Sequence, residues 1–200
     1  GISTFAGHTR AFVKAQDGCN HFCTYCIIRI IRGTARSRPL AEIRDEVARL
    51  SAAGYKEIVL TGIQLGSYGY EPEFSYTLSD VIDAISEEQG IHRIRLSSIE
   101  PMDIDDRLIE CMRGNKKLCN HLHISLQSGD NAVLKKMNRG YQREDFLRMV
   151  KTLHASRAGF LYSTDVIAGF PGESEAAFEN TVSLLNEIPP MKIHVFPYSD

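Results

Sequence analysis

Apolar residues along the chain alternate between short β-type runs and longer stretches with helical spacing. The short runs are rich in β-branched and other apolar residues, which is typical of strands. Six strands are predicted in this way: Ala11–Gln16, Glu57–Thr61, Ile91–Ser97, Leu122–Leu126, Leu161–Ala168 and Lys192–Phe196.

The intervals between these runs carry helical periodicity. Leu40, Ile43, Val47 and Leu50 recur on one helix face, and Gly54 stands where a C′ glycine would end the helix, so a helix is predicted over residues 39–53. Similar apolar stripes predict four further helices, which contain Leu78–Ile85, Leu108–Met112, Phe146–Leu153 and Phe178–Leu185. The order is a strand and a helix repeated five times, and then a last strand.

This alternation predicts an α/β fold with a parallel sheet. Six strands are three-quarters of an eight-stranded barrel, so the simplest architecture is an open, partial (β/α)6 barrel. A doubly wound open sheet is the alternative, and in either fold the reactive groups are expected at the carboxyl ends of the strands. Small, polar and turn-forming residues do follow the predicted strands: Asp17-Gly18-Cys19, Thr61-Gly62, Ser97-Ser98, Gln127-Ser128-Gly129, Gly169 and Tyr198-Ser199.

Length and composition fit one domain, because 200 residues with 43% hydrophobic content can build a buried core. The chain begins without methionine and stops directly after an apolar run, so we expect an internal piece of a longer polypeptide. We expect residues 1–10 to be a linker or N-terminal remnant and residues 11–200 to form the core domain.

The charge and cysteine content narrow the class of protein. A formal net charge of −2 gives no general basic field, so if the substrate is a nucleic acid, another domain or a local patch must hold it. No leader sequence and no membrane-length apolar run is present, which predicts a soluble protein without a membrane partner. Five cysteines are too few for a disulfide scaffold and favour a cytoplasmic protein with a metal site.

Three of the cysteines, Cys19, Cys23 and Cys26, follow the first predicted strand with the spacing CxxxCxxC. Three thiolate ligands leave one iron of a [4Fe–4S] cluster free, and this spacing suggests S-adenosylmethionine as the molecule bound there. The alternative is a structural zinc site completed by His21 or a distant cysteine, although zinc sites usually pair CxxC with a second CxxC or HxxxH motif. The two remaining cysteines, Cys111 and Cys119, are expected to be packing residues.

The CxxxCxxC motif with an aromatic residue, Tyr25, before the last cysteine resembles the radical S-adenosylmethionine superfamily. Further segments resemble its methylthiotransferase branch over nearly the whole chain: Arg36–Pro39, Leu60–Gly62, Ser97–Pro101, His121–Gly129, Lys136–Tyr141 and Thr164–Glu173. Within that branch, Thr61–Gly69 and Ser97–Pro101 look most like the enzymes that modify N6-threonylcarbamoyladenosine in tRNA.

The resemblance implies transfer of a methylthio group to C2 of that nucleoside at tRNA position 37. It implies a tRNA anticodon loop as partner, a reductant such as flavodoxin or ferredoxin, a second [4Fe–4S] cluster on an N-terminal domain absent from this chain, and an absent C-terminal TRAM domain. Three alternatives stay open: a related branch acting on isopentenyladenosine in tRNA or on ribosomal protein S12, a noncatalytic metal-stabilised binding module, and a degenerate copy. The last is motivated by Arg29-Ile30-Ile31, which departs from the family pattern.

The resemblance also implies cofactor-binding residues at the carboxyl ends of the strands, which together form the rim of the barrel. Gly62 would let the methionine amino group approach the backbone, with a plain turn glycine as the alternative. Ser98 and Glu100 would bond the methionine end or the ribose, Gln127 would serve the ribose or the substrate, and Tyr25 would pack against the adenine.

The roles of three further polar residues, Asp165, Arg139 and His123, can be predicted on physical grounds. Asp165 lies in an otherwise apolar strand, where a carboxylate needs partners, so a hydrogen bond to the cofactor or to a rim arginine is expected. Arg139 could neutralise the S-adenosylmethionine carboxylate or meet a tRNA phosphate. His123, in the fourth strand, is expected to be a satisfied core histidine rather than a ligand.

Overall fold

A computed structural model describes residues 9–199 of the chain. The six predicted strands are confirmed, with small shifts at their ends. They are β1 (Ala11–Lys14), β4 (Glu57–Thr61), β5 (Arg93–Leu96), β6 (His121–Gln127), β7 (Leu161–Ala168) and β8 (Lys192–Pro197).

These strands form one curved parallel sheet in chain order. Regular ladders join β1, β4 and β5 in one half and β6, β7 and β8 in the other. Parallel bridges between Ile94 and Leu118 and between Ile99 and Ile124 connect the halves, and the Ile99 amide donates to the His123 carbonyl at 2.9 Å. Because the strand order never reverses, the predicted partial barrel holds and the doubly wound alternative does not.

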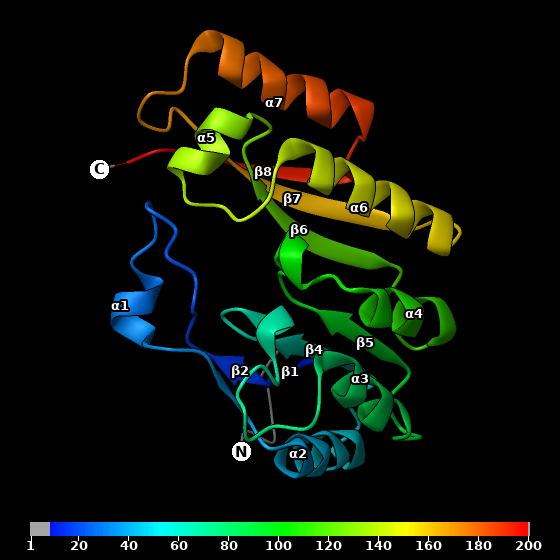
Figure 1. Cartoon of the computed structure of the whole chain (residues 1–200). Coiled ribbons are helices and arrows are strands. Elements are labelled where there is room, and N and C mark those ends of the chain that lie inside the picture. Colours follow the sequence, from blue (N-terminus) through cyan, green and yellow to red (C-terminus); the bar gives the residue numbers. More distant parts are fainter. Residues whose placement is uncertain (1–8, 200) are drawn as a thin grey trace.

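The five predicted helices are also confirmed. They are α2 (Leu40–Ala52), α3 (Leu78–Ser86), α4 (Asp106–Gly114), α6 (Arg143–Ser156) and α7 (Glu175–Glu187). Gly54 has φ +95°, as expected of the residue that ends α2. Figure 1 shows these helices around the outer side of the strands.

The core lies between the helices and the outer face of the sheet. Ile43 and Leu50 of α2 are fully buried and belong to the same apolar cluster as Val13 and Ile58 of the strands. Each such side chain contributes about 1.5–3 kcal/mol by leaving water. Because side chains alternate along a strand, the residues between the core positions project from the opposite, inner face of the barrel.

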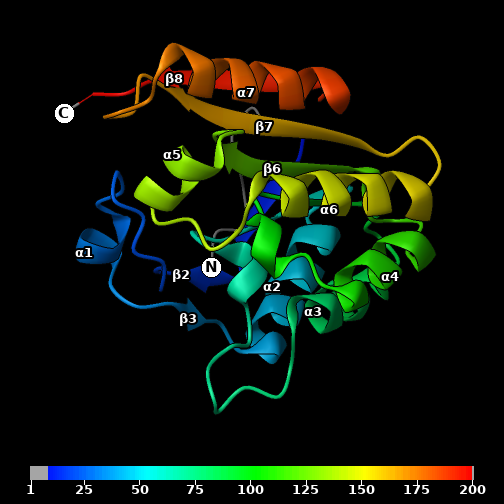
Figure 2. The ribbon, with the colours of Figure 1, turned by 45° about the horizontal axis from the view of Figure 1, so that its top comes forward.

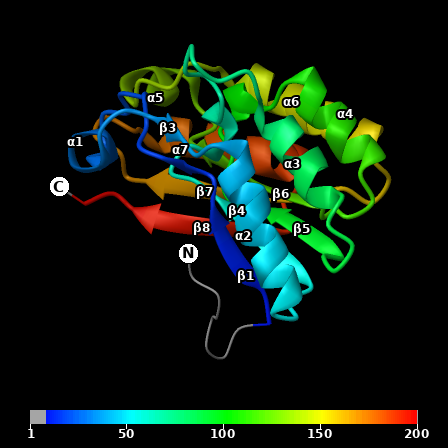
Figure 3. The same cartoon turned by 90° about the horizontal axis from the view of Figure 1, so that it is seen from below.

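Six short elements were not predicted, and two of them are the 3-10 helices η1 (Leu65–Ser67) and η2 (Pro101–Asp103). The predicted strand over 11–16 breaks at Ala15, and β2 (Gln16–Asp17) turns away to pair antiparallel with β3 (Arg36–Ser37). The helices α1 (Ile28–Arg32) and α5 (Asn131–Lys136) lie near the carboxyl ends of the strands (Figures 2 and 3). They are too short for their periodicity to be recognised in the sequence.

Candidate functional site

The cysteine motif occupies the loop between β2 and α1 and is folded by backbone contacts. Gly18 has φ +73°, and a Cβ there would lie 2.0 Å from the Thr34 carbonyl oxygen, so this position requires glycine. The Cys19 amide donates to the Gly33 carbonyl at 3.1 Å, and the Cys26 amide donates to the Cys23 carbonyl at 3.1 Å. Cys19 and Cys23 are half-buried and Cys26 is exposed.

The loop is tied to the second half of the barrel through the end of α5. The Thr24 amide donates to the Met137 carbonyl at 3.2 Å, and the Thr24 hydroxyl donates to the Lys136 carbonyl at 3.0 Å. The Asn138 side-chain amide donates to the Phe22 carbonyl at 2.9 Å. These contacts join residues more than 100 positions apart.

The first half of the barrel holds the same loop through two glutamines. The Asn20 amide donates to Gln64 Oε1 at 3.2 Å, and the Gln64 amide donates to Gln16 Oε1 at 2.8 Å. Gln16 Nε2 in turn donates to the Gly18 carbonyl at 2.8 Å. The cysteine loop therefore bridges both halves of the barrel.

Two N–H groups are directed at the cysteine sulfurs. Arg139 Nη1 donates to Cys23 Sγ at 3.3 Å, and the His21 amide donates to Cys19 Sγ at 3.4 Å. Hydrogen bonds of this kind stabilise charge on sulfur and are one means by which proteins tune iron–sulfur clusters. The predicted ligands thus have donors in place at two of three sulfurs.

The surroundings of Cys19 determine whether its thiol carries a proton. Burial raises the pKa of the Cys19 thiol, and the nearby Cys23, Glu100 and Cys26 raise it further against the lowering effect of the His21 hydrogen bond. A thiol in this setting stays protonated at neutral pH unless a metal replaces the proton. Two ring or guanidinium nitrogens beside it, His21 Nε2 and Arg139 Nε, are buried without a hydrogen-bond partner.

The spacing of the sulfurs bears on the zinc alternative. Two sulfurs bound to one zinc at about 2.3 Å cannot lie more than about 4.6 Å apart. Within residues 9–199, only one group of three potential metal ligands has its atoms mutually within 4.8 Å, and it contains none of the three motif cysteines. The loop is therefore more open than a single-ion site, and its donor set fits a multi-iron cluster.

Arg139 and Glu100 are paired with each other, and their predicted contacts with the cofactor or a phosphate stay predictions. The Arg139 side chain is only 4% exposed, and its Nη2 forms an ion pair with the Glu100 carboxylate. The same guanidinium lies 3.2 Å from the Tyr25 hydroxyl. A buried charge needs such a partner, which is why this arginine is not free to face solvent.

Tyr25 lies in a small second apolar cluster. Its ring packs against buried side chains of α5, α7 and the loop after β7: Val133, Met137, Phe170 and Ala177. Burial is the main cause that raises the pKa of the Tyr25 hydroxyl, so the group stays neutral. Its contact with adenine stays a prediction.

The remaining predicted rim residues lie where the strands end. A Cβ on Gly62 would lie 2.9 Å from both Gln16 Oε1 and Leu65 Cα, so close packing alone requires glycine there. Gln127 has φ +69°, in the left-handed region, where the β6–β7 ladder shifts register. Such strained backbone clusters at functional sites. Ser98 is exposed after β5, and the cofactor roles of all three residues stay predictions.

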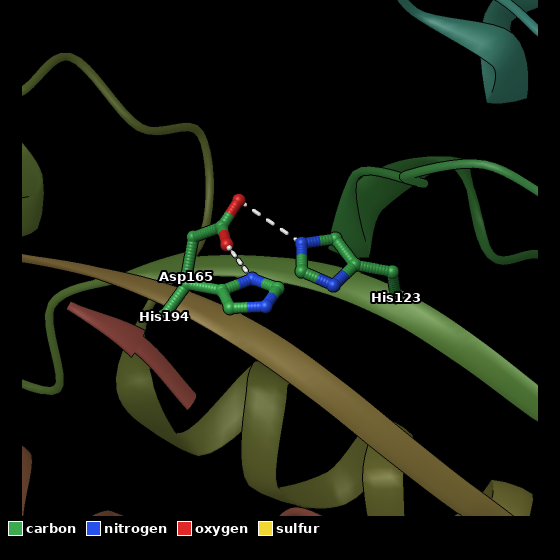
Figure 4. Close-up of side chains that lie close together, drawn as sticks. All are labelled: His123, Asp165 and His194. Atoms are coloured by element: carbon green, nitrogen blue, oxygen red, sulfur yellow. Dashed lines mark hydrogen bonds and ion pairs between the residues drawn. The ribbon is translucent and has the colours of Figure 1, made fainter. Parts of the chain in front are cut away.

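Asp165 lies against two histidines rather than a rim arginine, and its predicted hydrogen bond to the cofactor stays a prediction. Its two carboxylate oxygens lie 3.0 Å from His123 Nε2 and 3.0 Å from His194 Nδ1, as Figure 4 shows. Burial acts to raise the pKa of Asp165, but the hydrogen bonds and charges of the two histidines outweigh it and hold the pKa below its usual range. His123 is thus hydrogen-bonded, as expected, but on the inner face rather than in the core.

Sequence reasoning missed two residues near these sites. His194 lies on the same row of the sheet as Asp165, which only the strand register reveals. Asp103 packs against Gly66 beside the rim, and burial together with the Glu100 carboxylate raises its pKa to about 6. In the sequence, Asp103 is an acidic residue two positions after Pro101, and this pattern indicated neither its burial nor its raised pKa.

The fold and the cysteine loop together define a partial (β/α) barrel with a three-cysteine loop at its strand ends. The family profile of the radical SAM superfamily matches residues 13–185. The chain belongs to that superfamily, and the fold prediction is confirmed.

Two solved structures of radical SAM enzymes have the same fold as this chain. The radical S-adenosylmethionine methyltransferase TsrM from Kitasatospora setae, with cobalamin and a [4Fe–4S] cluster bound, superposes with a TM-score of 0.75 at 18% identity, covering 94% of this chain and 36% of that one. Coproporphyrinogen III oxidase from Escherichia coli, a radical SAM enzyme, gives 0.67 at 16% identity over 97% of this chain and 46% of that one. These structures show the shared fold, and the match to the radical SAM family supports the predicted cofactors, a [4Fe–4S] cluster and S-adenosylmethionine.

Curated relatives are much more similar in sequence. The threonylcarbamoyladenosine tRNA methylthiotransferase MtaB of Thermotoga maritima is 42% identical over 98% of this chain, and that of Bacillus subtilis is 44% identical over 99%. The tRNA-2-methylthio-N(6)-dimethylallyladenosine synthase of Clostridium tetani is 40% identical over 96%. The chain spans 42–45% of the length of these relatives. Among residues 9–199, no helix is both long and apolar enough to cross a bilayer.

Proposed function

We propose that this chain is the catalytic core of a tRNA methylthiotransferase that acts on N6-threonylcarbamoyladenosine at position 37. Cys19, Cys23 and Cys26 hold a [4Fe–4S] cluster in this proposal. The observation that carries it is the cysteine loop, which both halves of the barrel clamp at the strand ends with N–H donors on two sulfurs. Held by these three thiolates, a cluster would have an iron available for S-adenosylmethionine and would supply one-electron reduction of its sulfonium.

The chain's own residues prepare this site. Arg139 donates to Cys23 and is held in place by Glu100, so a fixed positive charge lies beside the thiolates. Tyr25 and its apolar cluster exclude water on one side of the loop. A low local dielectric strengthens both effects, since charges interact more strongly away from water.

The choice of substrate in this proposal is based on the names of the curated relatives. Several curated relatives at 40–44% identity are named as threonylcarbamoyladenosine enzymes, which supports that nucleoside. Dimethylallyladenosine synthases at 40–42% identity make the isopentenyl-type nucleoside the second candidate. Position 37 lies in a single-stranded anticodon loop, where a base is extruded at lower cost than from a duplex.

The remaining partners belong to the whole protein. A net charge of −2 argues that most of the tRNA backbone is gripped outside residues 1–200, so the tRNA anticodon loop alone meets this core. A second cluster on an N-terminal domain would donate sulfur, and flavodoxin or ferredoxin would supply electrons in the cytoplasm.

Anaerobic reconstitution of the full-length protein tests the proposal. We expect iron and acid-labile sulfide, formation of 5′-deoxyadenosine from S-adenosylmethionine with dithionite, and the methylthio nucleoside in tRNA by mass spectrometry. Cys23→Ser should abolish all three, whereas Cys111→Ser, which changes a half-buried thiol outside the loop, should not. A protein that binds one zinc at the loop and releases no 5′-deoxyadenosine would refute it.

A further inference from the structure

The inner wall of the barrel carries a second group of possible metal ligands, formed by His123, Asp165 and His194. They stand on three adjacent strands, β6, β7 and β8. Asp165 is the direct register partner of His194. Their neighbours Ile124 and Thr164 are fully buried toward the helices, so the three side chains project together from the opposite face.

Their ligand atoms already have the spacing of a metal site. One nitrogen or oxygen from each residue lies within 4.8 Å of the others, and in the part of the chain that the structure describes this is the single such group. Both histidine nitrogens lie 3.0 Å from oxygens of the one carboxylate (Figure 4). Ligands bound to one ion at about 2.0–2.2 Å have separations of this order.

The surroundings of His123 match those of a metal-binding histidine. Its outer nitrogen, Nδ1, lies 2.8 Å from the Ser163 hydroxyl oxygen, which is also 3.1 Å from His121 Nε2. A ligating histidine usually places its second ring nitrogen against such a partner, because this fixes the tautomer and the ring orientation. With Nδ1–H donated to Ser163, the Nε2 lone pair is directed at the position shared with Asp165.

The charge and access of the group favour a cation. The Asp165 carboxylate supplies negative charge beside the two imidazoles, and burial is incomplete, with side chains 16–40% exposed. In the absence of metal, the same contacts serve as two N–H···O hydrogen bonds.

We propose that His123, Asp165 and His194 bind a divalent transition-metal ion of the zinc class, separate from the cysteine loop. Two imidazole nitrogens and one carboxylate oxygen are a donor set that zinc accepts, and three protein ligands leave a position open for water or a ligand oxygen on the inner side of the barrel. Asp165 lies mid-strand, four residues before the rim glycine Gly169, whereas the cysteines lie beyond the strand ends. The two sites therefore differ in both place and donor type.

Zinc binding by the cluster-loaded, full-length protein tests this inference. After incubation with Zn²⁺ and gel filtration, we expect one retained zinc per chain whose X-ray absorption fine structure shows only nitrogen and oxygen at about 2.0 Å, without sulfur at about 2.3 Å. This measurement on the unsubstituted protein does not depend on whether any variant folds. No retained zinc, or zinc bound through sulfur, would overturn the inference.

Variants locate the site. Asp165→Asn and His123→Gln should each lose the zinc, and Ser163→Ala should weaken zinc binding by about 10–100-fold. His92→Gln, at an exposed residue directly before β5, should bind zinc as the parent does. Zinc kept by Asp165→Asn would also overturn the inference. Iron content, measured on the same samples, should be unchanged in all four variants, so a failure here is distinct from a failure of the proposed cluster.

Discussion

The cysteine loop and the inner-wall group His123, Asp165 and His194 are positioned in different ways. The loop is irregular backbone, held by hydrogen bonds to segments from both halves of the barrel. The inner-wall group stands on regular parallel strands, whose ladder sets the relative positions of its members. The loop can therefore adapt to a large group such as a cluster, whereas the strands present a fixed spacing suited to one ion.

The largest effect is expected from Cys23→Ser, which should disable the cysteine loop and leave the inner-wall group intact. Cys23→Ser should abolish iron binding and S-adenosylmethionine cleavage, because the loop loses the sulfur to which Arg139 donates. The same variant should retain zinc with nitrogen and oxygen ligands, since the inner-wall group shares no residue with the loop. Metal analysis of the anaerobically loaded full-length protein checks both results. Loss of both metals together would show that the two regions depend on one another.

The buried pair of Arg139 and Glu100 should give the next largest effect. Arg139→Met leaves the partly buried Glu100 carboxylate without its partner and should lower the free energy of unfolding by about 3 kcal/mol. Urea unfolding followed by circular dichroism measures this change. Arg148→Met is the matched control, because the pair of Arg148 with Asp145 is exposed and should contribute little. Equal effects of the two variants would contradict the role assigned to Arg139.

The contributions of the Asp103 and Asp165 carboxyl groups to the free energy of unfolding should depend on pH with opposite sign. The pKa of Asp103 is raised to about 6 by burial, so its contribution to stability is present below its ordinary value of 3.8 and is lost as pH rises toward 6. The pKa of Asp165 is lowered, despite burial, by its two histidines, so its contribution is lost only as pH falls through that lowered value.

Asp103→Asn tests the first of these signs. Removing the charge should raise the free energy of unfolding at pH 7.5 by about 1–3 kcal/mol and by less at pH 5. Urea midpoints at the two pH values measure the difference, with the exposed Asp45→Asn as control. A stabilisation of equal size at both pH values would show that the Asp103 carboxyl is not responsible.

The difference between local sequence patterns and contacts made by the tertiary fold explains what the sequence could predict. The six strands and the five long helices were predictable, because periodicity is a local property. The spacing of Cys19, Cys23 and Cys26 is also local, and their role as cluster ligands stays a prediction. His194 was not, since its proximity to Asp165 depends on the register between β7 and β8. The pairing of Arg139 with Glu100 joins residues 39 positions apart through the tertiary fold. Spacing along the chain cannot give such distances.

The tether between the loop and α5 should show the smallest effect. Thr24→Val keeps the shape of the side chain but removes the hydroxyl that donates to the Lys136 carbonyl at 3.0 Å, an exposed bond of about 0.5–1 kcal/mol. The loop should then open more often, and iron should be lost several-fold faster to a chelator under anaerobic conditions.

Thr152→Val provides the matched control for this tether. Its hydroxyl also donates to a carbonyl at 3.0 Å, that of Arg148, but within α6 and away from the cysteines. Global stability should therefore change similarly in both variants, whereas only Thr24→Val should accelerate iron loss. If the two variants lose iron at the same rate, the contact with α5 does not govern access to the cluster, and the loop is held mainly by the first half of the barrel through Gln64.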